Sequence, residues 1–286
     1  MKFMKFVLAA SLVSFNVQAF ESSDKLLLTG GVNQLEGSAG GGLTPWALIG
    51  GYGTQEQIGA NAFYTNVAIS DYNLVSTGAL VGIHDRVELS YAHQSFDTKD
   101  VGTALGLGYG FKLKQSIFGI KVKLIGDAVL DQDSWLPQIA FGIQYKKHEQ
   151  GKIVRSVGAK DDKSFDFYLA GTKIFLAQSI LANVTLRATE ANQLGILGYG
   201  GDRINHHQLM IEGSVAYLLT RKIAVGVEYR TKPNNLNVAS EDAWFDAFVA
   251  WAPMKNVSAT LAYAYLGNIV LNQDQSSLYT SIQLGF

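Results

Sequence analysis

The sequence predicts an all-β protein: a transmembrane antiparallel β-barrel of about twelve strands, with short periplasmic turns and longer extracellular loops. The chain is apolar, with 48% hydrophobic and 16% charged residues, whereas soluble domains carry roughly 25% charged residues. After its first residues it has no run close to the ~18 apolar residues of a spanning helix. Hydrophobic residues instead alternate with polar or small ones, which is the pattern of membrane strands.

Residues 1–19 have the features of a secretory signal peptide. Lys2 and Lys5 precede a mostly apolar run, and Val17 and Ala19 are the small residues of a cleavage site. The apolar run is too short to span a membrane as a helix. We therefore expect the mature chain to be exported and to reside in the outer membrane of a Gram-negative cell.

Residues 20–57 form a glycine-rich N-terminal segment that contains Gly40-Gly41-Gly42 and Gly50-Gly51. Glycine lets backbone pack closely against other backbone, so a plug inside the barrel lumen is one alternative for this segment. A periplasmic tail and an additional strand from Trp46 to Tyr52 are the others. The phosphate-loop motif G-x-x-x-x-G-K-[ST] is absent, which leaves nucleotide binding without support.

Residues 58–286 are predicted to form the barrel itself. The predicted strands cover 58–69, 72–83, 86–96, 117–127, 136–147, 165–176, 180–189, 206–219, 222–232, 243–252, 256–266 and 277–286. Twelve is an even number, as single-chain bacterial barrels require. The first two strands alternate least regularly, so ten and fourteen strands remain alternatives.

The last strand carries the clearest signal. From Leu278 to Phe286, apolar residues or threonine occupy every second position, with small residues, tyrosine or glutamine between them. A chain that ends on such a strand, with Leu284 and Phe286 on its apolar face, resembles the assembly signature of bacterial outer-membrane proteins. The resemblance implies the barrel-assembly machinery as a transient partner and outer-membrane lipid as the surroundings.

The lengths of the links between strands predict which end of the barrel faces which compartment. Short links fall at 83–85, 177–179, 220–221 and 253–255, and long polar links fall at 97–116, 148–164, 190–205, 232–242 and 267–276. In outer-membrane barrels the short turns are periplasmic and the long loops extracellular. If the last strand ends in the periplasm, counting back along the strands places every one of these short links on the periplasmic side. It places every one of these long links on the extracellular side.

Six basic and five acidic side chains fall on the inward face of the predicted strands. A charge facing lipid would cost roughly 2–4 kcal/mol near the bilayer midplane, which argues for the inward placement. The predicted lumen-lining residues are Arg86, Glu88, Lys121, Lys123, Asp127, Lys146, Arg187, Glu212, Glu228, Arg230 and Asp246. The sequence leaves two roles open for these charges: a structural filling of the lumen and a selectivity device. A strongly selective pore usually shows charges of one sign, whereas this set contains both.

His93 and Ser95 are the only catalytic candidates, and they are weak ones. The H-x-S pair resembles that of outer-membrane phospholipases and lipid A deacylases, and it would lie near the outer end of strand 86–96. A histidine base there would activate a serine against an acyl ester. Those families continue with an asparagine where Phe96 and Asp97 follow here, so an interfacial polar pair without catalysis is the favoured interpretation.

Composition excludes several partners and sites. Without Lys2 and Lys5 the mature chain has 21 basic and 24 acidic residues, a net charge of −3, and lacks the cationic excess that nucleic acid requires. The chain has no cysteine, which removes disulfides and thiolate sites. His206 and His207 would need further ligands for a metal. No cofactor and no metal are expected.

Over most of its mature length the chain resembles a proteobacterial outer-membrane β-barrel family catalogued as a domain of unknown function, DUF3034. The resemblance rests on Gly30-Gly31-Val32-Asn33 through Pro45-Trp46, on Phe118-Gly119 through Asp127, and on Trp135-Leu136-Pro137-Gln138. Because this family brings no activity, the expected function comes from the barrel: a porin-like channel for small solutes, and no enzyme. The alternatives are a non-conducting structural or accessory barrel, such as one for envelope polymer export, and, third, an outer-membrane lipid hydrolase.

Overall fold

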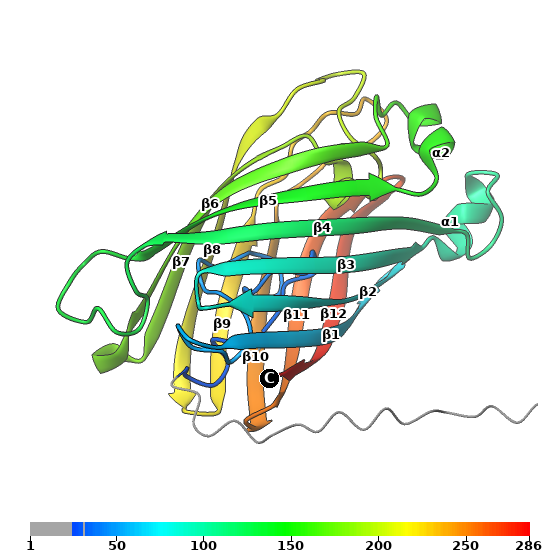
Figure 1. The fold of residues 1–286 in the computed structure, drawn as a ribbon. Helices are drawn as coiled ribbons and strands as arrows, with labels where there is room; N and C mark the ends of the chain where they lie inside the picture. The colour runs from blue at the N-terminus through cyan, green and yellow to red at the C-terminus, as the bar shows by residue number, and fades with distance from the viewer. Residues whose placement is uncertain (1–24, 31) are drawn as a thin grey trace, which may run out of the picture.

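The computed structural model describes residues 25–30 and 32–286, and there it forms a closed barrel of twelve antiparallel strands (Figure 1). Each strand pairs with its neighbours in the chain, and β1 pairs with β12 to close the barrel. The strands are β1 Ile58–Ile69, β2 Asn73–Ile83, β3 Val87–Asp97, β4 Lys112–Ile125, β5 Gln138–His148, β6 Lys163–Phe175, β7 Ile180–Thr189, β8 Gln208–Thr220, β9 Ile223–Arg230, β10 Trp244–Met254, β11 Val257–Ile269 and β12 Asn272–Gly285. The predicted fold class is confirmed. The predicted signal peptide lies outside the described residues.

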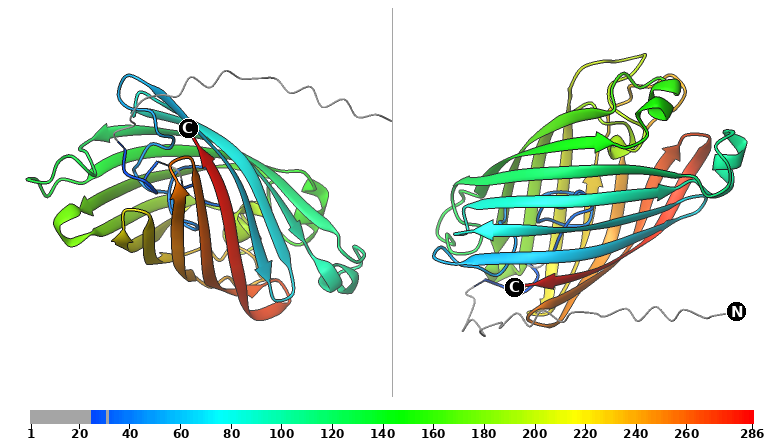
Figure 2. Two further views of the ribbon diagram at one scale, coloured as in Figure 1. Left: turned by 90° about the horizontal axis from the view of Figure 1, so that it is seen from below. Right: turned by 45° about the vertical axis from the view of Figure 1, so that its right-hand side comes forward.

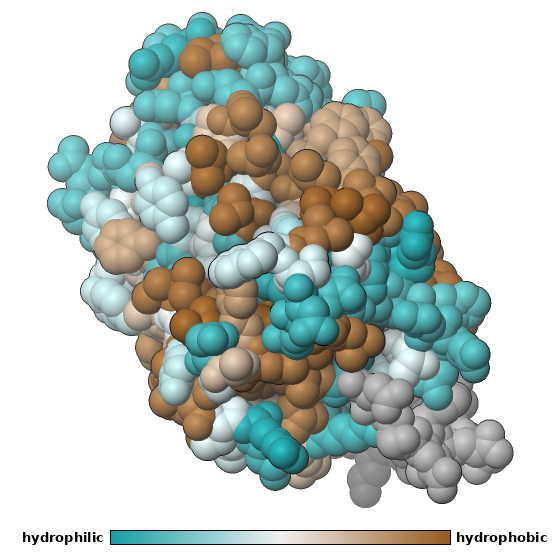
Figure 3. Space-filling model, turned by 90° about the vertical axis from the view of Figure 1, so that its left-hand side faces the viewer, coloured by the Kyte–Doolittle hydropathy of each residue, from teal (hydrophilic) through white to brown (hydrophobic). Residues whose placement is uncertain are grey.

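Side chains alternate between the two faces of every strand, and β10 shows this most simply. Its burial alternates from Trp244 onward, so that Phe245, Val249 and Trp251 are exposed on the outer face while Ala250 faces a crowded interior. Large apolar side chains that are exposed in this way occur on all twelve strands. Figure 3 shows such apolar side chains gathered on one face, with hydrophilic ones above them. Lipid contact explains an exterior of this kind.

Short helices lie in several of the links, as Figures 1 and 2 show. At the long-loop end are α1 (Lys99–Ala104), α2 (Gly151–Ser156) and the 3-10 turn η2 (Asn192–Gly195), and at the short-turn end is the 3-10 turn η1 (Leu176–Gln178). None of the described helices is long and apolar enough to cross a bilayer.

Two links differ from the prediction. The link between β4 and β5, residues 126–137, is long although it lies at the short-turn end, where Lys123 contacts the β2–β3 turn. The link between β11 and β12, expected at 267–276, is a two-residue turn at Val270 and Leu271. Residues 272–276, at the start of β12, are polar because the hairpin continues to pair beyond the apolar band, as the match of Gly267 with Gln275 shows.

The described part of the N-terminal segment, residues 25–30 and 32–57, forms neither a strand nor a helix, and most of it lies inside the barrel. Figure 1 shows it in dark blue, enclosed by the strands, and every residue from 32 to 53 is buried. Glycine makes this close packing feasible: a Cβ on Gly41 would collide with the carboxylate of Glu228, and Gly37, with a φ of +99°, lies against β3. The lumen is therefore filled by chain and not only by side chains of the strands.

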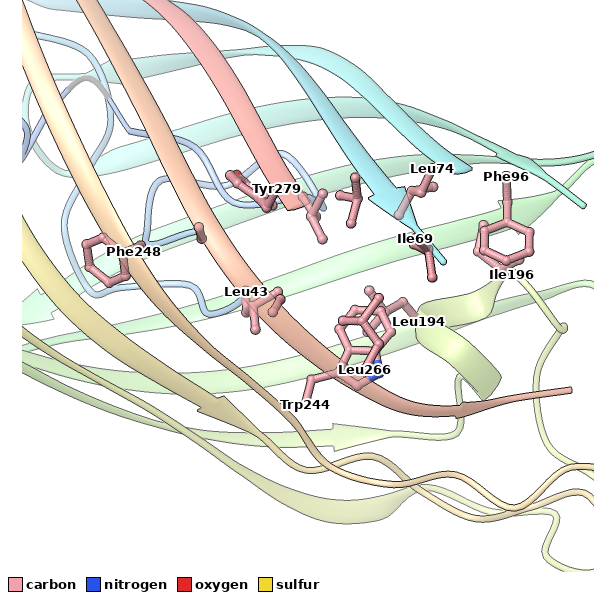
Figure 4. Close-up of a cluster of buried hydrophobic side chains, with 14 of the residues drawn as sticks. Leu43, Ile69, Leu74, Phe96, Leu194, Ile196, Trp244, Phe248, Leu266 and Tyr279 are labelled. Atoms are coloured by element: carbon pink, nitrogen blue, oxygen red, sulfur yellow. The ribbon is translucent and has the colours of Figure 1, made fainter. Parts of the chain in front are cut away.

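A second segment narrows the lumen from the opposite end. The outer loop, residues 190–207 between β7 and β8, folds inward and buries Leu194, Ile196 and Leu197. Figure 4 shows Leu194 and Ile196 among apolar side chains of the strands, with Leu43 of the N-terminal segment nearby. The interior thus contains a polar region around the N-terminal segment, an apolar layer below the outer loop, and a second apolar region where Val32 and Trp46 of the segment lie near Phe248 of β10.

Candidate functional site

The inner wall of the barrel carries a ladder of alternating charges on five adjacent strands. Lys146 on β5, Asp166 on β6, Arg187 on β7, Glu212 on β8 and Arg230 on β9 are all almost completely buried. Lys146 lies 2.7 Å from Asp166, Arg187 lies 3.3 Å from Asp166, and Arg230 lies 3.4 Å from Glu212. Arg187 also pairs with Glu212. Buried charges need such partners, because an unpaired charge in the interior is costly.

Glu36 of the N-terminal segment adds a third carboxylate to this ladder. It pairs with Lys146, its Oε2 accepts a hydrogen bond of 2.8 Å from Arg230, and Nη2 of Arg187 lies 3.6 Å from the same oxygen. Three cations, Lys146, Arg187 and Arg230, now face three anions. The segment therefore balances the charge of the wall that surrounds it.

A second pair of wall charges binds the backbone of the segment. Glu88 on β3 and Lys121 on β4 are 3.1 Å apart and nearly inaccessible to solvent. Glu88 accepts hydrogen bonds from the amides of Ala39 (3.1 Å) and Gly50 (2.8 Å). Lys121 donates to three segment carbonyls, those of Ala39, Trp46 and Leu48, at 2.7 to 3.1 Å. This pair fixes the position of the middle of the segment.

Glu228 on β9 anchors a further turn of the segment. Its carboxylate accepts hydrogen bonds from the amide of Leu43 (2.8 Å) and the hydroxyls of Thr44 (2.7 Å) and Ser214 (2.8 Å). Asp246 lies opposite Glu228 in the register of β9 and β10. Its Oδ1 is buried and has no hydrogen-bond partner among the described residues.

The start of the segment is tied to the short-turn rim by a chain of ion pairs. Lys25 lies 2.7 Å from Asp85, Lys123 lies 2.8 Å from Asp85, and Lys123 lies 3.2 Å from Asp127. Burial opposes ionisation of Asp127, but hydrogen bonds from the amides of Leu130 and Val129, together with Lys123, keep its pKa below the usual value. A cavity of about 420 Å³ lies between the segment and the 126–137 link.

At the opposite end, Glu241 and Lys232 hold the outer loop. The Glu241 carboxylate accepts the amide of Gln193 at 2.8 and 3.0 Å, and Lys232 donates to the Gln193 side chain at 2.9 Å. Burial raises the pKa of Glu241 to about 7 against the opposing effect of Lys232. Burial lowers the pKa of Lys232 to about 8. Gln193 and Leu194 have left-handed backbone angles, with φ of 44° and 62°, which these contacts sustain.

The structure brings most of the predicted lumen-lining residues together. Eight of the eleven are buried in the interior: Glu88, Lys121, Lys146, Arg187, Glu212, Glu228, Arg230 and Asp246. Lys123 and Asp127 lie at the short-turn rim. Arg86 is exposed in the turn before β3, because the strand begins one residue later than predicted, and so it lies outside the packed lumen.

Several residues of this site were not predicted. Asp166 alternates with the outward-facing Phe165 and Phe167, so assigning faces on that strand would have found it. Lys232 shares the inward face of Glu228 and Arg230 in the predicted strand 222–232, so the same alternation would have found it, although β9 itself ends at Arg230. Glu36 and Glu241 lie in the N-terminal segment and a loop, where no periodicity assigns a face.

The catalytic candidates lie on the outer face of β3. His93 and Ser95 are half-buried and alternate with the buried Ala92, Gln94 and Phe96. Nδ1 of His93 lies 3.9 Å from Oε1 of Glu149. No hydrogen bond joins His93 to Ser95 in the described part of the chain, and within residues 25–30 and 32–286 no group of three His, Asp or Glu could hold a metal ion.

The predicted assembly residues face outward at the end of the chain. Leu284 and Phe286 are exposed, and β12 pairs with β1 next to them. The role of these two residues in assembly stays a prediction.

Comparison with known proteins supports the fold. A family model described as "Protein of unknown function (DUF3034)" matches residues 29–283. No curated protein matches the sequence. Among solved structures, the KdgM porin in complex with disordered oligogalacturonate is similar with a TM-score of 0.52 at 10% identity, over 79% of this chain and 99% of that one. The NanC porin is similar with a TM-score of 0.50 at 9% identity, over 78% of this chain and 98% of that one. The fold is that of outer-membrane β-barrels.

Proposed function

The chain belongs to the DUF3034 family, whose description names no activity, and from the geometry we propose a porin-like outer-membrane channel for small solutes. The N-terminal segment acts as its plug and the outer loop as a second closure. Passage requires that the segment move within the lumen or leave it through the periplasmic end.

The contacts between wall and segment support this proposal. A barrel with a purely structural interior can fill its lumen with side chains of its own strands. Here the wall charges Glu88, Lys121 and Glu228 instead bind backbone amides and carbonyls of a separate segment. A wall that presents hydrogen-bonding groups to a removable occupant is also suited to present them to water and solutes.

A disulfide between plug and wall tests the proposal in the full chain, which has no cysteine of its own. The hydroxyls of Thr44 and Ser214 are 2.5 Å apart, so Thr44→Cys with Ser214→Cys places two sulfur atoms within bonding reach. In a planar bilayer we expect the oxidised double variant to be closed and the reduced one to conduct like the unmodified chain. Each single variant is the control.

The runner-up is a non-conducting barrel with a structural or accessory role. The complete pairing of the charge ladder favours it, because nothing there is left for a solute while the segment is in place. If the unmodified chain and the reduced double variant both carry no current under any applied voltage, this alternative replaces the channel.

We propose that the protein is not a lipid hydrolase. His93 and Ser95 face outward, and the only acid within 4 Å of His93 in the described chain is Glu149, at a distance too long for a hydrogen bond. Phospholipid hydrolysis by the purified protein that disappears in both His93→Ala and Ser95→Ala would overturn this conclusion.

A further inference from the structure

We infer that Lys146, Arg187 and Arg230, called the cationic cradle below, form a binding site for one carboxylate group of a small acidic solute. In the closed barrel Glu36 occupies this site from within the same chain. The inference rests on the proposed channel function, because a solute reaches the cradle only through the lumen.

The cradle has the geometry of a built site. Its three cations come from three different strands, β5, β7 and β9, and converge on one carboxylate. Both oxygens of Glu36 are used, Oε1 by Lys146 and Oε2 by Arg230 and Arg187. Side chains that project from strands of a closed barrel are held in place by the sheet, so the site keeps its shape when its occupant leaves.

Charge counting shows what the cradle lacks without the segment. The wall supplies two acids to the three cations, Asp166 and Glu212, and both are held between strand neighbours. Displacing Glu36 therefore leaves one positive charge without a partner. In a lumen shielded from bulk water, that charge attracts an anion far more strongly than the same charge would at an exposed surface.

Glu36 is also the single charged side chain that the segment inserts into the interior. Of the charged residues between 25 and 57, Lys25 lies at the rim and Glu56 is exposed. The other wall charges, such as Glu88 and Lys121, bind backbone atoms of the segment, which are uncharged. The cradle alone is matched to an ion, which sets it apart from contacts that only position the segment.

The cradle lies where an incoming solute would meet it. Nζ of Lys146 is 3.5 Å from the carbonyl of Leu194 in the outer loop, so the site lies directly below that loop. A solute that passes the outer loop reaches the outer side of the segment, where Leu35 and Leu43 also lie, and meets the cradle there. An acidic solute would compete with Glu36 there, and a neutral one would not.

Chemical rescue tests this in the full chain. Glu36→Ala leaves a space of carboxylate size and one unpaired buried charge, so amide hydrogen exchange of residues 32–43 should become roughly a hundredfold faster. Acetate should restore the slow exchange, whereas acetamide, its neutral counterpart of the same shape, should not. In the double variant Glu36→Ala with Arg230→Gln, acetate should lose its effect.

Two outcomes would overturn the carboxylate site: acetamide acting as well as acetate, or neither slowing exchange in a folded Glu36→Ala protein. If Glu36→Ala does not fold, the unmodified chain supplies the test, because glucuronate should speed exchange of residues 32–43 and glucose should not. Equal effects of the two sugars would contradict the inference. Acetate rescue in a protein that never conducts would refute the channel and leave the site standing.

Discussion

The two segments that close the lumen are held by different forces. The N-terminal segment is bound by charged and polar wall groups, such as the Glu88–Lys121 pair, that contact its backbone. The outer loop inserts Leu194, Ile196 and Leu197 into an apolar layer, and ions contact it mainly at Gln193. Its other polar contacts to the wall are mostly neutral hydrogen bonds, such as those of Gln115 with the Leu194 carbonyl and the Tyr199 hydroxyl. Hydrogen bonds and ion pairs are directional and fix one position, whereas apolar contacts tolerate sliding and repacking. We therefore expect the segment to release in an all-or-none way and the outer loop to adjust gradually.

The largest effect on the N-terminal segment is expected when a wall charge that contacts it is removed. Lys121→Met leaves Glu88 buried and unpaired and removes three hydrogen bonds to the segment. Breaking a buried pair in this way costs about 3–5 kcal/mol. We expect a lower melting temperature and fast amide exchange at residues 39–50. Lys112→Met, at an exposed position of the same strand, should change neither.

Shortening Leu194, an apolar side chain that anchors the outer loop, should loosen the outer loop and leave the N-terminal segment in place. Leu194→Ala should weaken the packing of the outer loop by an amount near the lower end of about 2–5 kcal/mol, since a loop relaxes more easily than a core. Amide exchange should rise within residues 190–201 and stay slow in the N-terminal segment. Faster exchange in both would mean that the two closures move as one unit. Val238→Ala, at an exposed loop position, is the control.

The polar anchor of the outer loop makes its closure depend on pH. Because burial raises the pKa of Glu241 to about 7, the closed loop binds a proton more readily than the open one and gains stability as pH falls through 7. The pKa of Lys232, lowered to about 8, adds stability as pH rises above 8. Closure should be weakest between pH 7 and 8, as measured by single-channel opening. Glu241→Gln should abolish the change on the acid side and move the change on the basic side to lower pH, because the carboxylate no longer stabilises the charged form of Lys232.

The smallest effect is expected from one neutral hydrogen bond to the segment. Ser76 and Gln94 both donate to the carbonyl of Leu35. Ser76→Ala leaves that carbonyl with one donor, so the loss should lie at the low end of about 0.5–1.5 kcal/mol. A fall in melting temperature as large as that of Lys121→Met would show that the segment depends on neutral bonds as much as on charges.

The barrel could be predicted because its strands have a regular period. The N-terminal segment and the outer loop have no such period, so their positions in the lumen could not be predicted in the same way. β7 has the predicted bounds, because its side chains alternate over the whole strand. β1 also has the predicted bounds, although its sequence alternates less regularly. β4 begins at Lys112, five residues before the predicted start at 117. Its first residues are polar because they pair above the lipid, where neither face has to be apolar.

The candidate site was half predictable for the same reason. Arg187 and Glu212 were assigned inward because a charge in a strand cannot face lipid cheaply. Glu36, their partner, lies in an irregular segment whose contacts depend on tertiary structure alone. The outer loop carried a local signal, the apolar residues Leu194, Ile196 and Leu197 within a link that otherwise reads as polar.

The last residue of the chain couples two parts of the molecule. The carbonyl of Phe286 accepts hydrogen bonds from the amide of Ala60 in β1 and from that of Tyr52 at the end of the N-terminal segment, each at 2.9 Å. The pairing of β1 with β12 that closes the barrel and the docking of the N-terminal segment thus share one oxygen atom. Departure of the segment would leave the seam bond to Ala60 intact and remove the bond to Tyr52, and a tag fused after Phe286 would lie beside both contacts.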